Sequence, residues 1–174
     1  MIGIFGSAFN PPTKGHACVI KGALSVFDRV IAVPSYDHCF GKIMAPFKVR
    51  VAMASALIDD INSDKVTLSE IEAIIWNGSP VSSLSVLRAL SLLYPNEKIH
   101  LIIGPDNADS FDKFKHHDII TRDFGVYVAP DAGGELPRST EVRRRITRSE
   151  PFFDAVTPSV AKLLIKTHYH FQGI

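Results

Sequence analysis

The sequence predicts an α/β fold in which five parallel strands form one doubly wound sheet with strand order 3-2-1-4-5. Three observations predict it. The 174-residue chain opens on an apolar segment that is followed at once by a helical pattern. Five short apolar runs typical of buried strands then alternate with helix-like spacing of apolar residues. Strand–helix–strand alternation implies parallel pairing, and the order 3-2-1-4-5 brings strands 1 and 4 together at the topological switch point.

The first two strands flank the first helix. Ile2 to Phe5 is apolar, and no charge appears before Lys14, which indicates a buried strand. The segment from Gly15 to about Phe27 has apolar residues at helical spacing. Val30 to Val33 is a second apolar run, and Pro34 ends it.

A long loop, a helix and a short strand follow. Residues 35–46 are expected to form the loop, and Phe47 to Ile58 has the apolar spacing of a helix. Val66 to Leu68 predicts a third strand near an edge of the sheet. Residues 71–83 carry no clear pattern. Leu84 to Leu93 predicts another helix, because apolar residues recur at helical spacing there and Pro95 stops the pattern.

The last two strands are each closed by glycine and proline. Ile99 to Ile103 is the fourth strand, and the segment from Asn107 to Ile120 is expected to form short helices. Gly125 to Ala129 is the fifth strand. Ser139 to Ile146 begins with the hydroxyl residues that favour a helix N-terminus, and a final helix is expected from Thr157 to Lys166.

Composition narrows the class of protein. The chain is 46% apolar and 21% charged, which is typical of a globular domain, and residues 1–174 are expected to form one domain. A net charge of +1 gives no reason to expect a nucleic-acid partner, and no apolar run is long enough to span a membrane. Cys18 and Cys39 stand at no metal or redox spacing, so we expect a cytoplasmic protein with free thiols. The sequence carries no signal of oligomeric state.

The segment between the first strand and the first helix is suited to phosphate. In an open α/β sheet, ligands bind outside the carboxyl ends of the strands. Gly6 allows the backbone to approach a ligand closely, and the N-terminus of the following helix offers N–H groups and a positive dipole end. Thr13 and His16 add side-chain donors. We therefore expect an anionic ligand at this loop.

The eleven residues Gly6 to His16, GSAFNPPTKGH, resemble the signature G-[ST]-x-F-[DN]-P-x-[HT]-x-G-H of the HxGH-type nucleotidyltransferase superfamily. Thr13 stands at the first position of HxGH, a variant that the family allows. The resemblance implies the Rossmann-like nucleotidyltransferase fold and ATP as a substrate. The ATP-binding residues that it implies in this segment are Gly6, Ser7, Phe9, Gly15 and His16.

Two later segments are similar to nicotinate or nicotinamide mononucleotide adenylyltransferases. The fourth strand runs into Gly104-Pro105-Asp106, which resembles a family strand ending in G-x-D and implies that Gly104 and Asp106 lie near ATP. RSTEVR, residues 138–143, resembles the family's I-S-S-T-x-[IV]-R, with Arg138 in place of the first serine. Ser139, Thr140 and Arg143 would then hold the β- and γ-phosphates from a helix N-terminus.

The expected acceptor site has weaker support in the sequence. Phe114 stands where the family commonly has a tryptophan that stacks on the pyridine ring, and the alternative is a core phenylalanine. Arg50 begins a segment that resembles the family's R-x-x-M, and with Lys42 it could hold the mononucleotide phosphate. Ser79 lies in place of the family's S-Y-T-x-x-T-L segment, most of which is lost. Trp76 could add an aromatic face or be a partly buried core residue.

The resemblance implies adenylyl transfer in NAD biosynthesis. A mononucleotide phosphate would attack the α-phosphorus of ATP and release pyrophosphate, with Mg²⁺ bound largely by phosphate and water and no dedicated metal site. His16 would contact the α-phosphate, Thr13 the triphosphate and Arg143 the leaving pyrophosphate. Two alternatives stay open: a phosphopantetheine adenylyltransferase, and a non-catalytic nucleotide-binding protein on the same fold. The sequence does not separate nicotinate from nicotinamide mononucleotide.

Overall fold

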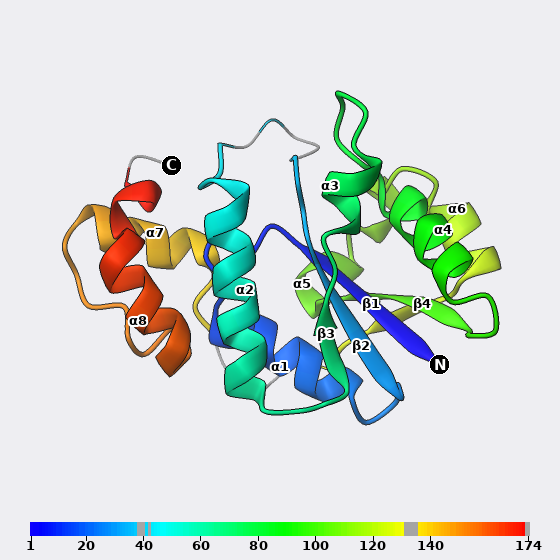
Figure 1. Cartoon of the computed structure of the whole chain (residues 1–174), viewed down its shortest axis with the longest axis horizontal. Helices are drawn as coiled ribbons and strands as arrows, with labels where there is room; N and C mark the ends of the chain where they lie inside the picture. Colours follow the sequence, from blue (N-terminus) through cyan, green and yellow to red (C-terminus); the bar gives the residue numbers. More distant parts are fainter. Residues whose placement is uncertain (38–40, 42, 131–135, 173–174) are drawn as a thin grey trace.

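A computed structural model describes residues 1–37, 41, 43–130 and 136–172 (Figure 1). Its five strands form one sheet in the order β3-β2-β1-β4-β5, and every neighbouring pair is parallel. The predicted fold class and strand order are therefore confirmed. The strands are β1 (Ile2–Ser7), β2 (Arg29–Pro34), β3 (Val66–Leu68), β4 (Ile99–Ile103) and β5 (Val126–Val128).

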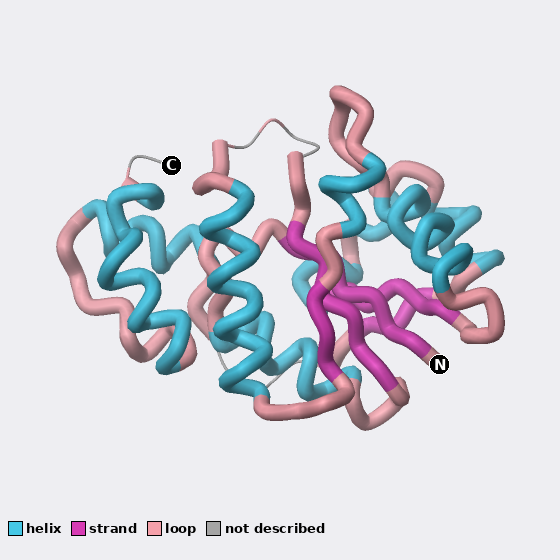
Figure 2. Tube along the Cα trace, in the orientation of Figure 1, coloured by secondary structure: helices cyan, strands magenta, loops and turns pink. Residues whose placement is uncertain are grey.

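Helices cover both faces of the sheet (Figures 1 and 2). The buried residues fall into two clusters. One cluster joins the sheet to α1, α2, α7 and α8, and the other joins it to α3, α4 and α6. The α-helices are α1 (Lys14–Ala23), α2 (Phe47–Ile61), α3 (Ile71–Ile75), α4 (Ser83–Leu93), α5 (Pro105–Ala108), α6 (His117–Asp123), α7 (Ser139–Thr147) and α8 (Pro158–Thr167), and two 3₁₀ helices are η1 (Phe111–Lys113) and η2 (His168–Phe171).

The central strand β1 shows why its sequence is apolar throughout. Ile2 and Ile4 point into the core beneath α3 and α4, whereas Phe5 belongs to the core beneath α1 and α2. Successive side chains of a strand alternate between faces, so a strand covered on both sides needs apolar residues at every position. Gly3 is the exception, because a Cβ there would lie 2.8 Å from the ring of Phe27. The missing side chain makes room for that ring.

The end of the first helix and the stretch 71–83 differ most from the expectation. The first helix ends at Ala23 rather than Phe27, because the chain turns there. The Ser25 hydroxyl donates to the carbonyl of Gly22 at 2.7 Å, and this local bond competes with continued helix. Phe27 is still buried, so its apolar character belongs to the core and not to the helix. The unassigned stretch 71–83 contains the short helix α3.

Asp60 of α2 caps the N-terminus of α8. Its carboxylate accepts the Ser159 backbone N–H at 2.8 Å and the Ser159 hydroxyl at 2.7 Å. Burial alone would raise the pKa of Asp60, but the hydrogen bonds, chiefly those from Ser159, outweigh it and lower the pKa. The ionised form is therefore the one that the fold stabilises.

We expect Asp60→Ala to lower the free energy of unfolding by about 1–2 kcal/mol, because helix caps contribute about that much. The cost should shrink as the pH falls through the lowered pKa of Asp60, since protonation removes the same stabilisation from the unmutated chain. Urea unfolding at two pH values measures both effects. Asp59→Ala, an exposed neighbour on the same helix, is the control. Equal losses in the two variants would contradict the assignment.

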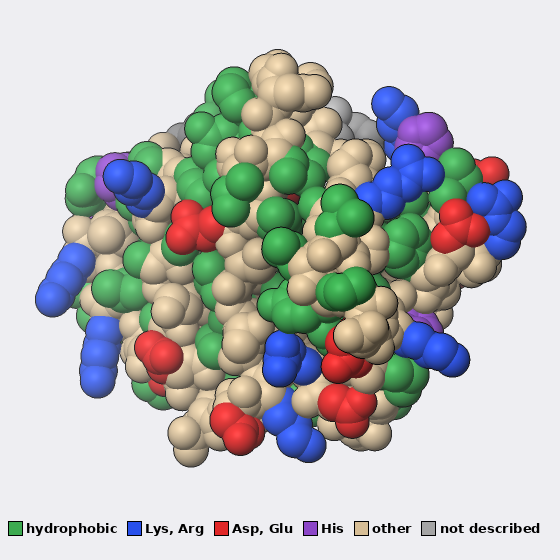
Figure 3. Space-filling model, turned by 45° about the vertical axis from the view of Figure 1, so that its right-hand side comes forward, with side chains coloured by type: hydrophobic (Ala, Val, Ile, Leu, Met, Phe, Trp, Pro, Cys, Tyr) green, Lys and Arg blue, Asp and Glu red, His purple; other side chains and the backbone are tan. Residues whose placement is uncertain are grey.

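Charged side chains of both signs are interspersed on the face shown in Figure 3. Among the described helices, none combines the length and the apolar character needed to cross a membrane. Cys18 is a free thiol, and Cys39 lies outside the described residues.

Candidate active site

The carboxyl ends of β1 and β4 lie side by side, as predicted for the switch point. β1 continues into residues 8–13, called here the β1–α1 loop, and β4 continues into the turn at Gly104. The two segments adjoin: a Cβ on Gly104 would lie 3.8 Å from Val19 of α1. The loop and the turn therefore lie on the same edge of the sheet, as the predicted strand order requires, and the space between them is called the crevice below.

His16 is held at this crevice through both ring nitrogens. Nδ1 accepts the backbone N–H of Thr13 at 3.0 Å, and the Thr13 hydroxyl lies 2.9 Å from the same atom. Nε2 lies 3.0 Å from the Ser7 hydroxyl. A backbone N–H can only donate, so Nδ1 carries no proton and the proton is on Nε2. The network thus assigns a neutral imidazole whose Nε2–H donates to the Ser7 hydroxyl in this structure.

The surroundings of His16 favour that neutral form. The ring of Phe9 lies 5.1 Å from the imidazole and the ring of Phe5 lies 6.1 Å from it, measured between centroids. Burial against this apolar floor lowers the pKa of His16 to about 4, although the nearby negative charge of Asp106 raises it. Protonation would also place a hydrogen on Nδ1, where it would face the Thr13 N–H, which is itself a donor. His16 is therefore neutral at ordinary pH.

The backbone of Phe9 is strained to place this floor. Its φ of 46° lies in the left-handed region that bulky residues rarely adopt, and its side chain is fully buried. The expectation for Phe9 was ATP binding. The structure puts its ring beneath His16 and against Phe5.

Thr13 lies against His16 and not toward the open side of the crevice. The residue is 1% exposed, and its hydroxyl and its N–H both face the imidazole. The sequence led us to expect Thr13 on the triphosphate. In this structure Thr13, at the first position of HxGH, orients His16, at the last position.

Helix α7 holds the β1–α1 loop from one side. The Ser139 hydroxyl donates to the carbonyl of Pro11 at 2.8 Å, and Nη1 of Arg143 donates to the carbonyl of Asn10 at 2.7 Å. Nη2 of Arg143 lies 3.2 Å from the Thr140 hydroxyl. Arg143 is 4% exposed, and burial lowers its pKa from the ordinary value. The three residues expected at the β- and γ-phosphates thus lie together at this loop, with two of them bonded to its carbonyls.

Arg50 of α2 holds the same loop from the other side. Its guanidinium donates to the carbonyls of Ala8 at 2.8 Å, Ser35 at 2.7 Å and Ala45 at 2.9 Å. The residue is 1% exposed, and burial lowers its pKa to about 10. We expected Arg50 at the mononucleotide phosphate. Its donors here are turned to the main chain, so we assign it a positioning role that ties the ends of β1 and β2 to the start of α2.

Asn10 adds a further contact that holds the β1–α1 loop in place. It was not among the residues expected at the site. Its Oδ1 accepts the backbone N–H of Ala45 at 3.0 Å, so it links the β1–α1 loop to the segment before α2. The [DN] position of the signature could have identified it, because a short acceptor side chain is what this contact needs.

Three glycines border the crevice. A Cβ on Gly6 would meet no described atom within 4 Å, whereas one on Gly15 would lie 3.4 Å from the Thr13 hydroxyl. A Cβ on Gly104 would lie 2.7 Å from the Asp106 carboxylate. Asp106 is in turn 3.9 Å from Arg138, the residue that departs from the family motif. The space above Gly6 is therefore open to a ligand, while Gly104 is needed for the position of Asp106.

We expect Gly6→Ala to leave the melting temperature within about 2 °C and to raise the KM for ATP about tenfold. The added methyl group meets nothing in the described chain, but it occupies the space through which a phosphate would approach the backbone. Initial rates at varied ATP and a thermal melt measure the two effects. Gly22→Ala, on α1 away from the loop, is the control for the KM alone, because its Cβ would lie 3.3 Å from Pro130. An unchanged KM would place the phosphates elsewhere.

The predicted acceptor residues are dispersed. Phe114 packs with Phe111 at 5.2 Å against the second core. Ser79 is exposed in the α3–α4 connection, and its hydroxyl donates to Asn77. Lys42 lies outside the described residues.

A cavity of about 380 Å³ opens beside the end of β2, and the sequence analysis missed it as a unit. Aromatic side chains from three segments share it, and only Trp76 had been singled out. Tyr36 and Phe47 carry no motif, so no signal in the sequence could join them. Its lining residues are Tyr36, Asp37, Met44, Ala45, Pro46, Phe47, Arg50 and Trp76.

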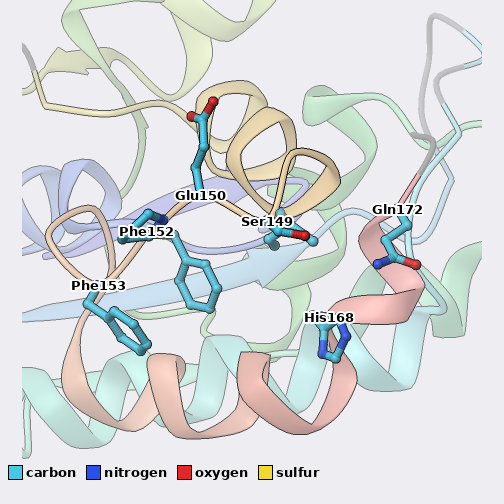
Figure 4. A pocket seen from close by; sticks show the side chains of 8 residues that line it. Ser149, Glu150, Phe152, Phe153, His168 and Gln172 are labelled. Atoms are coloured by element: carbon cyan, nitrogen blue, oxygen red, sulfur yellow. The ribbon is translucent and has the colours of Figure 1, made fainter.

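A second hollow, of about 340 Å³, lies between the C-terminal ends of α7 and α8 (Figure 4). Phe152 and Phe153 stack at 4.9 Å on one side of it, and His168 lies on the other. The hollow is at the opposite end of α7 from Ser139, and none of its lining residues belongs to the site described above. It does not extend the crevice at His16.

The charge of Asp106 acts on His16, and the Asp106 side chain is about half exposed. In the described part of the chain, no group of three or more His, Cys, Asp or Glu side chains is placed to hold a metal ion.

Comparisons with known proteins agree with the fold and the loop. The cytidylyltransferase-like family model matches residues 4–145. A solved Vibrio parahaemolyticus protein, assigned as a nicotinate-nucleotide adenylyltransferase, is 31% identical over 99% of this chain and 96% of its own, with a TM-score of 0.84. A Myxococcus xanthus protein named probable nicotinate-nucleotide adenylyltransferase is 30% identical over 89% of this chain and 86% of its own.

A more distant solved structure shows the same fold. It is the nicotinic acid mononucleotide adenylyltransferase of Plasmodium falciparum complexed with NaAD, with 18% identity, a TM-score of 0.75, and coverage of 97% of this chain and 96% of that one. The family model covers most of the chain, including the HxGH-type loop and most of α7. The chain therefore belongs to the cytidylyltransferase-like family and is a nucleotidyltransferase.

Proposed function

We propose that the chain transfers the adenylyl group of ATP to nicotinate mononucleotide, releasing pyrophosphate and forming the dinucleotide in NAD biosynthesis. The observation that carries the proposal is the neutral His16, whose Nε2–H lies at the end of β1 beside the open space above Gly6. The relatives named for this activity match the chain over most of its length and support the choice of acceptor.

The reaction needs position and charge stabilisation more than a base. An oxygen of the mononucleotide phosphate attacks the α-phosphorus of ATP, and the bond from that phosphorus to the β-bridging oxygen breaks. The attacking phosphate is already an anion near neutral pH, so no side chain has to remove a proton. His16 donates Nε2–H to an α-phosphate oxygen as charge develops there. Thr13 keeps the ring in that orientation through Nδ1, and the α-phosphate oxygen takes the place of the Ser7 hydroxyl as acceptor of Nε2–H.

The loop and the residues that hold it support an ATP site at the start of α1. Ser139 and Arg143 fix the carbonyl side of the β1–α1 loop, which leaves the start of α1 to face the phosphates. Thr140 is exposed at the N-terminus of α7 and is placed to reach the β- and γ-phosphates. Phosphate oxygens and water would hold most of the Mg²⁺ that ATP brings, and the ion would supply neutralising charge at the phosphates; Asp106, whose charge acts on His16, would orient the ligands on this side.

Pyrophosphate release from ATP tests the proposal. Nicotinate mononucleotide, nicotinamide mononucleotide and phosphopantetheine are offered separately with Mg²⁺, and the product masses are measured. We expect dinucleotide formation with nicotinate mononucleotide. Release with phosphopantetheine alone would assign the neighbouring activity, and ATP binding without release on any acceptor would assign a non-catalytic role.

A further inference from the structure

Arg138 departs from the family motif and lies at the edge of the crevice. It is the N-cap residue of α7, with an extended backbone (φ −82°, ψ 160°), and it stands where the motif has a serine. The next residue, Ser139, donates to the carbonyl of Pro11, and Leu136 lies 3.8 Å from the place of a Cβ on Gly15. The segment that carries Arg138 therefore runs along the β1–α1 loop and the start of α1.

The side chain of Arg138 extends to the turn after β4. Its Nη2 lies 3.9 Å from Oδ2 of Asp106, which belongs to the first turn of α5. The charge of Asp106 in turn acts on the His16 ring. The guanidinium of Arg138 is therefore on the crevice side of α7, beside the anion that acts on His16.

The contact between Arg138 and Asp106 is loose. The two side chains are 75% and 45% exposed, and a separation of 3.9 Å is too long for a hydrogen bond. Exposed ion pairs of this kind contribute little to stability, because water screens the charges. Little free energy is therefore lost when Arg138 leaves Asp106 for another anion.

The other arginines of α7 are held more closely. Arg143 is buried and donates to the carbonyl of Asn10. Arg144 and Arg145 each form two ion pairs of 2.7–2.9 Å with carboxylates of the chain. Among the arginines from the N-cap of α7 to its last turn, Arg138 is therefore the one that can turn to a bound phosphate at the smallest cost.

A guanidinium suits the charge of a triphosphate or of pyrophosphate. Arginine can bind phosphate through two parallel N–H donors, and such charged hydrogen bonds are shorter and stronger than neutral ones. The serine of the motif would offer a single uncharged hydroxyl. The arginine therefore adds a cation to the edge of the crevice that the motif residue does not supply.

We propose that Arg138 exchanges Asp106 for the terminal phosphates of ATP and then holds the pyrophosphate that leaves. The inference rests on the proposed function, because it adds a residue to that same site. Asp106 keeps the guanidinium beside the crevice before ATP binds, and it receives the guanidinium again when pyrophosphate departs. Arg138 acts through its charge and its two donors, without proton transfer.

Binding of inorganic pyrophosphate tests the inference without catalysis. In calorimetric titrations with Mg²⁺ present, Arg138→Ser should weaken pyrophosphate binding about tenfold, and Arg138→Lys, which keeps the charge without the fork, should recover part of the loss. Arg148→Ser removes an exposed arginine at the other end of α7 and is the control. Equal affinities in the wild type and Arg138→Ser, or an equal loss in Arg148→Ser, would overturn the inference. Absence of pyrophosphate binding to the wild type would overturn it as well.

Kinetics distinguish failure of this inference from failure of the proposed function. Arg138→Ser should raise the KM for ATP about tenfold and leave the KM for nicotinate mononucleotide and the melting temperature unchanged. An unchanged KM for ATP in a chain that forms the dinucleotide would overturn the inference and leave the proposed function intact. If the wild type forms no dinucleotide, the proposed function fails, and the pyrophosphate titration still decides the role of Arg138.

A double-mutant cycle tests the exchange with Asp106. Asp106→Asn removes the anion that competes for Arg138, so it should strengthen pyrophosphate binding. The gain should be about threefold larger when Arg138 is present than in Arg138→Ser, since an exposed ion pair contributes about that much. Equal gains with and without Arg138 would overturn the exchange, because Asp106 would then act on pyrophosphate directly.

Discussion

His16→Ala is expected to lower kcat by about 10²- to 10³-fold with the fold intact, because removing one positioned donor from a developing negative charge costs about that much. The imidazole is the group whose Nε2–H lies at the end of β1, and the bonds from Thr13 leave that proton no other tautomer. Pyrophosphate release under saturating ATP and acceptor measures the effect, and a thermal melt verifies the fold.

His16→Gln is the matched variant, since its amide nitrogen can reach the place of Nε2 without an ionisable group. We expect it to recover about tenfold of the loss. A rate for His16→Ala close to that of the wild type would remove His16 from the mechanism. A rate for His16→Gln as low as that of His16→Ala would show that a bare donor is insufficient.

The wild type and His16→Gln should show the same pH dependence of turnover from about pH 5 to pH 8. The pKa of His16 is lowered to about 4, so its imidazole is neutral throughout this range. We expect the rate to fall below about pH 6, because the phosphate of the acceptor becomes protonated there. This fall should be the same in His16→Gln. A fall found only in the wild type would mean that His16 titrates in the working range and acts as an acid or base.

Arg50→Met is expected to be the most damaging change to stability, with a loss of about 3–5 kcal/mol. The substitution leaves the carbonyls of Ala8, Ser35 and Ala45 without their buried donor. For a chain of this length, each 1 kcal/mol shifts the melting temperature by roughly 2–4 °C. Thermal melts should therefore show a drop of about 6–20 °C.

Lys48→Ala and Arg50→Lys separate the causes. Lys48 is exposed on the same helix, and its loss should leave the melting temperature unchanged. Arg50→Lys keeps the charge but not the fork that reaches several carbonyls. It should recover part of the stability and still lower kcat, because the β1–α1 loop loses one brace. Full activity in Arg50→Lys would restrict Arg50 to a role in stability.

The sequence predicted the strands, their order and the loop because these follow from local patterns. Apolar runs ended by proline or glycine identify strands, and the signature at Gly6 to His16 identifies the loop by residue type and spacing. The same patterns do not report which way a polar side chain turns. Arg50 and Thr13 were expected at phosphates, yet both are buried and bonded within the chain. Their partners come from other segments, and periodicity carries no information on them.

The aromatic cavity beside the end of β2 was the least predictable part for a related reason. Tyr36, Phe47 and Trp76 are single aromatic residues without a shared spacing, and only the packing of β2, α2 and α3 brings them together. Phe114 had the better motif, but its surroundings are a core cluster. A pocket assembled from distant segments leaves no local pattern in the sequence.

The hydrogen bonds from α7 to the β1–α1 loop determine when the site can form during synthesis of the chain. The loop is made first, but Ser139 and Arg143, which fix its carbonyls, follow it by 128 and 133 residues. Contacts between such distant segments form late, because the intervening chain has to be ordered before they can close. A nascent chain that has left the ribosome as far as α6 would already carry the whole signature and the first four strands, but only one of the two arginines that hold the loop. We therefore expect nucleotide binding to appear only when α7 emerges, so that the part of the catalytic centre translated first is completed by one of the last helices.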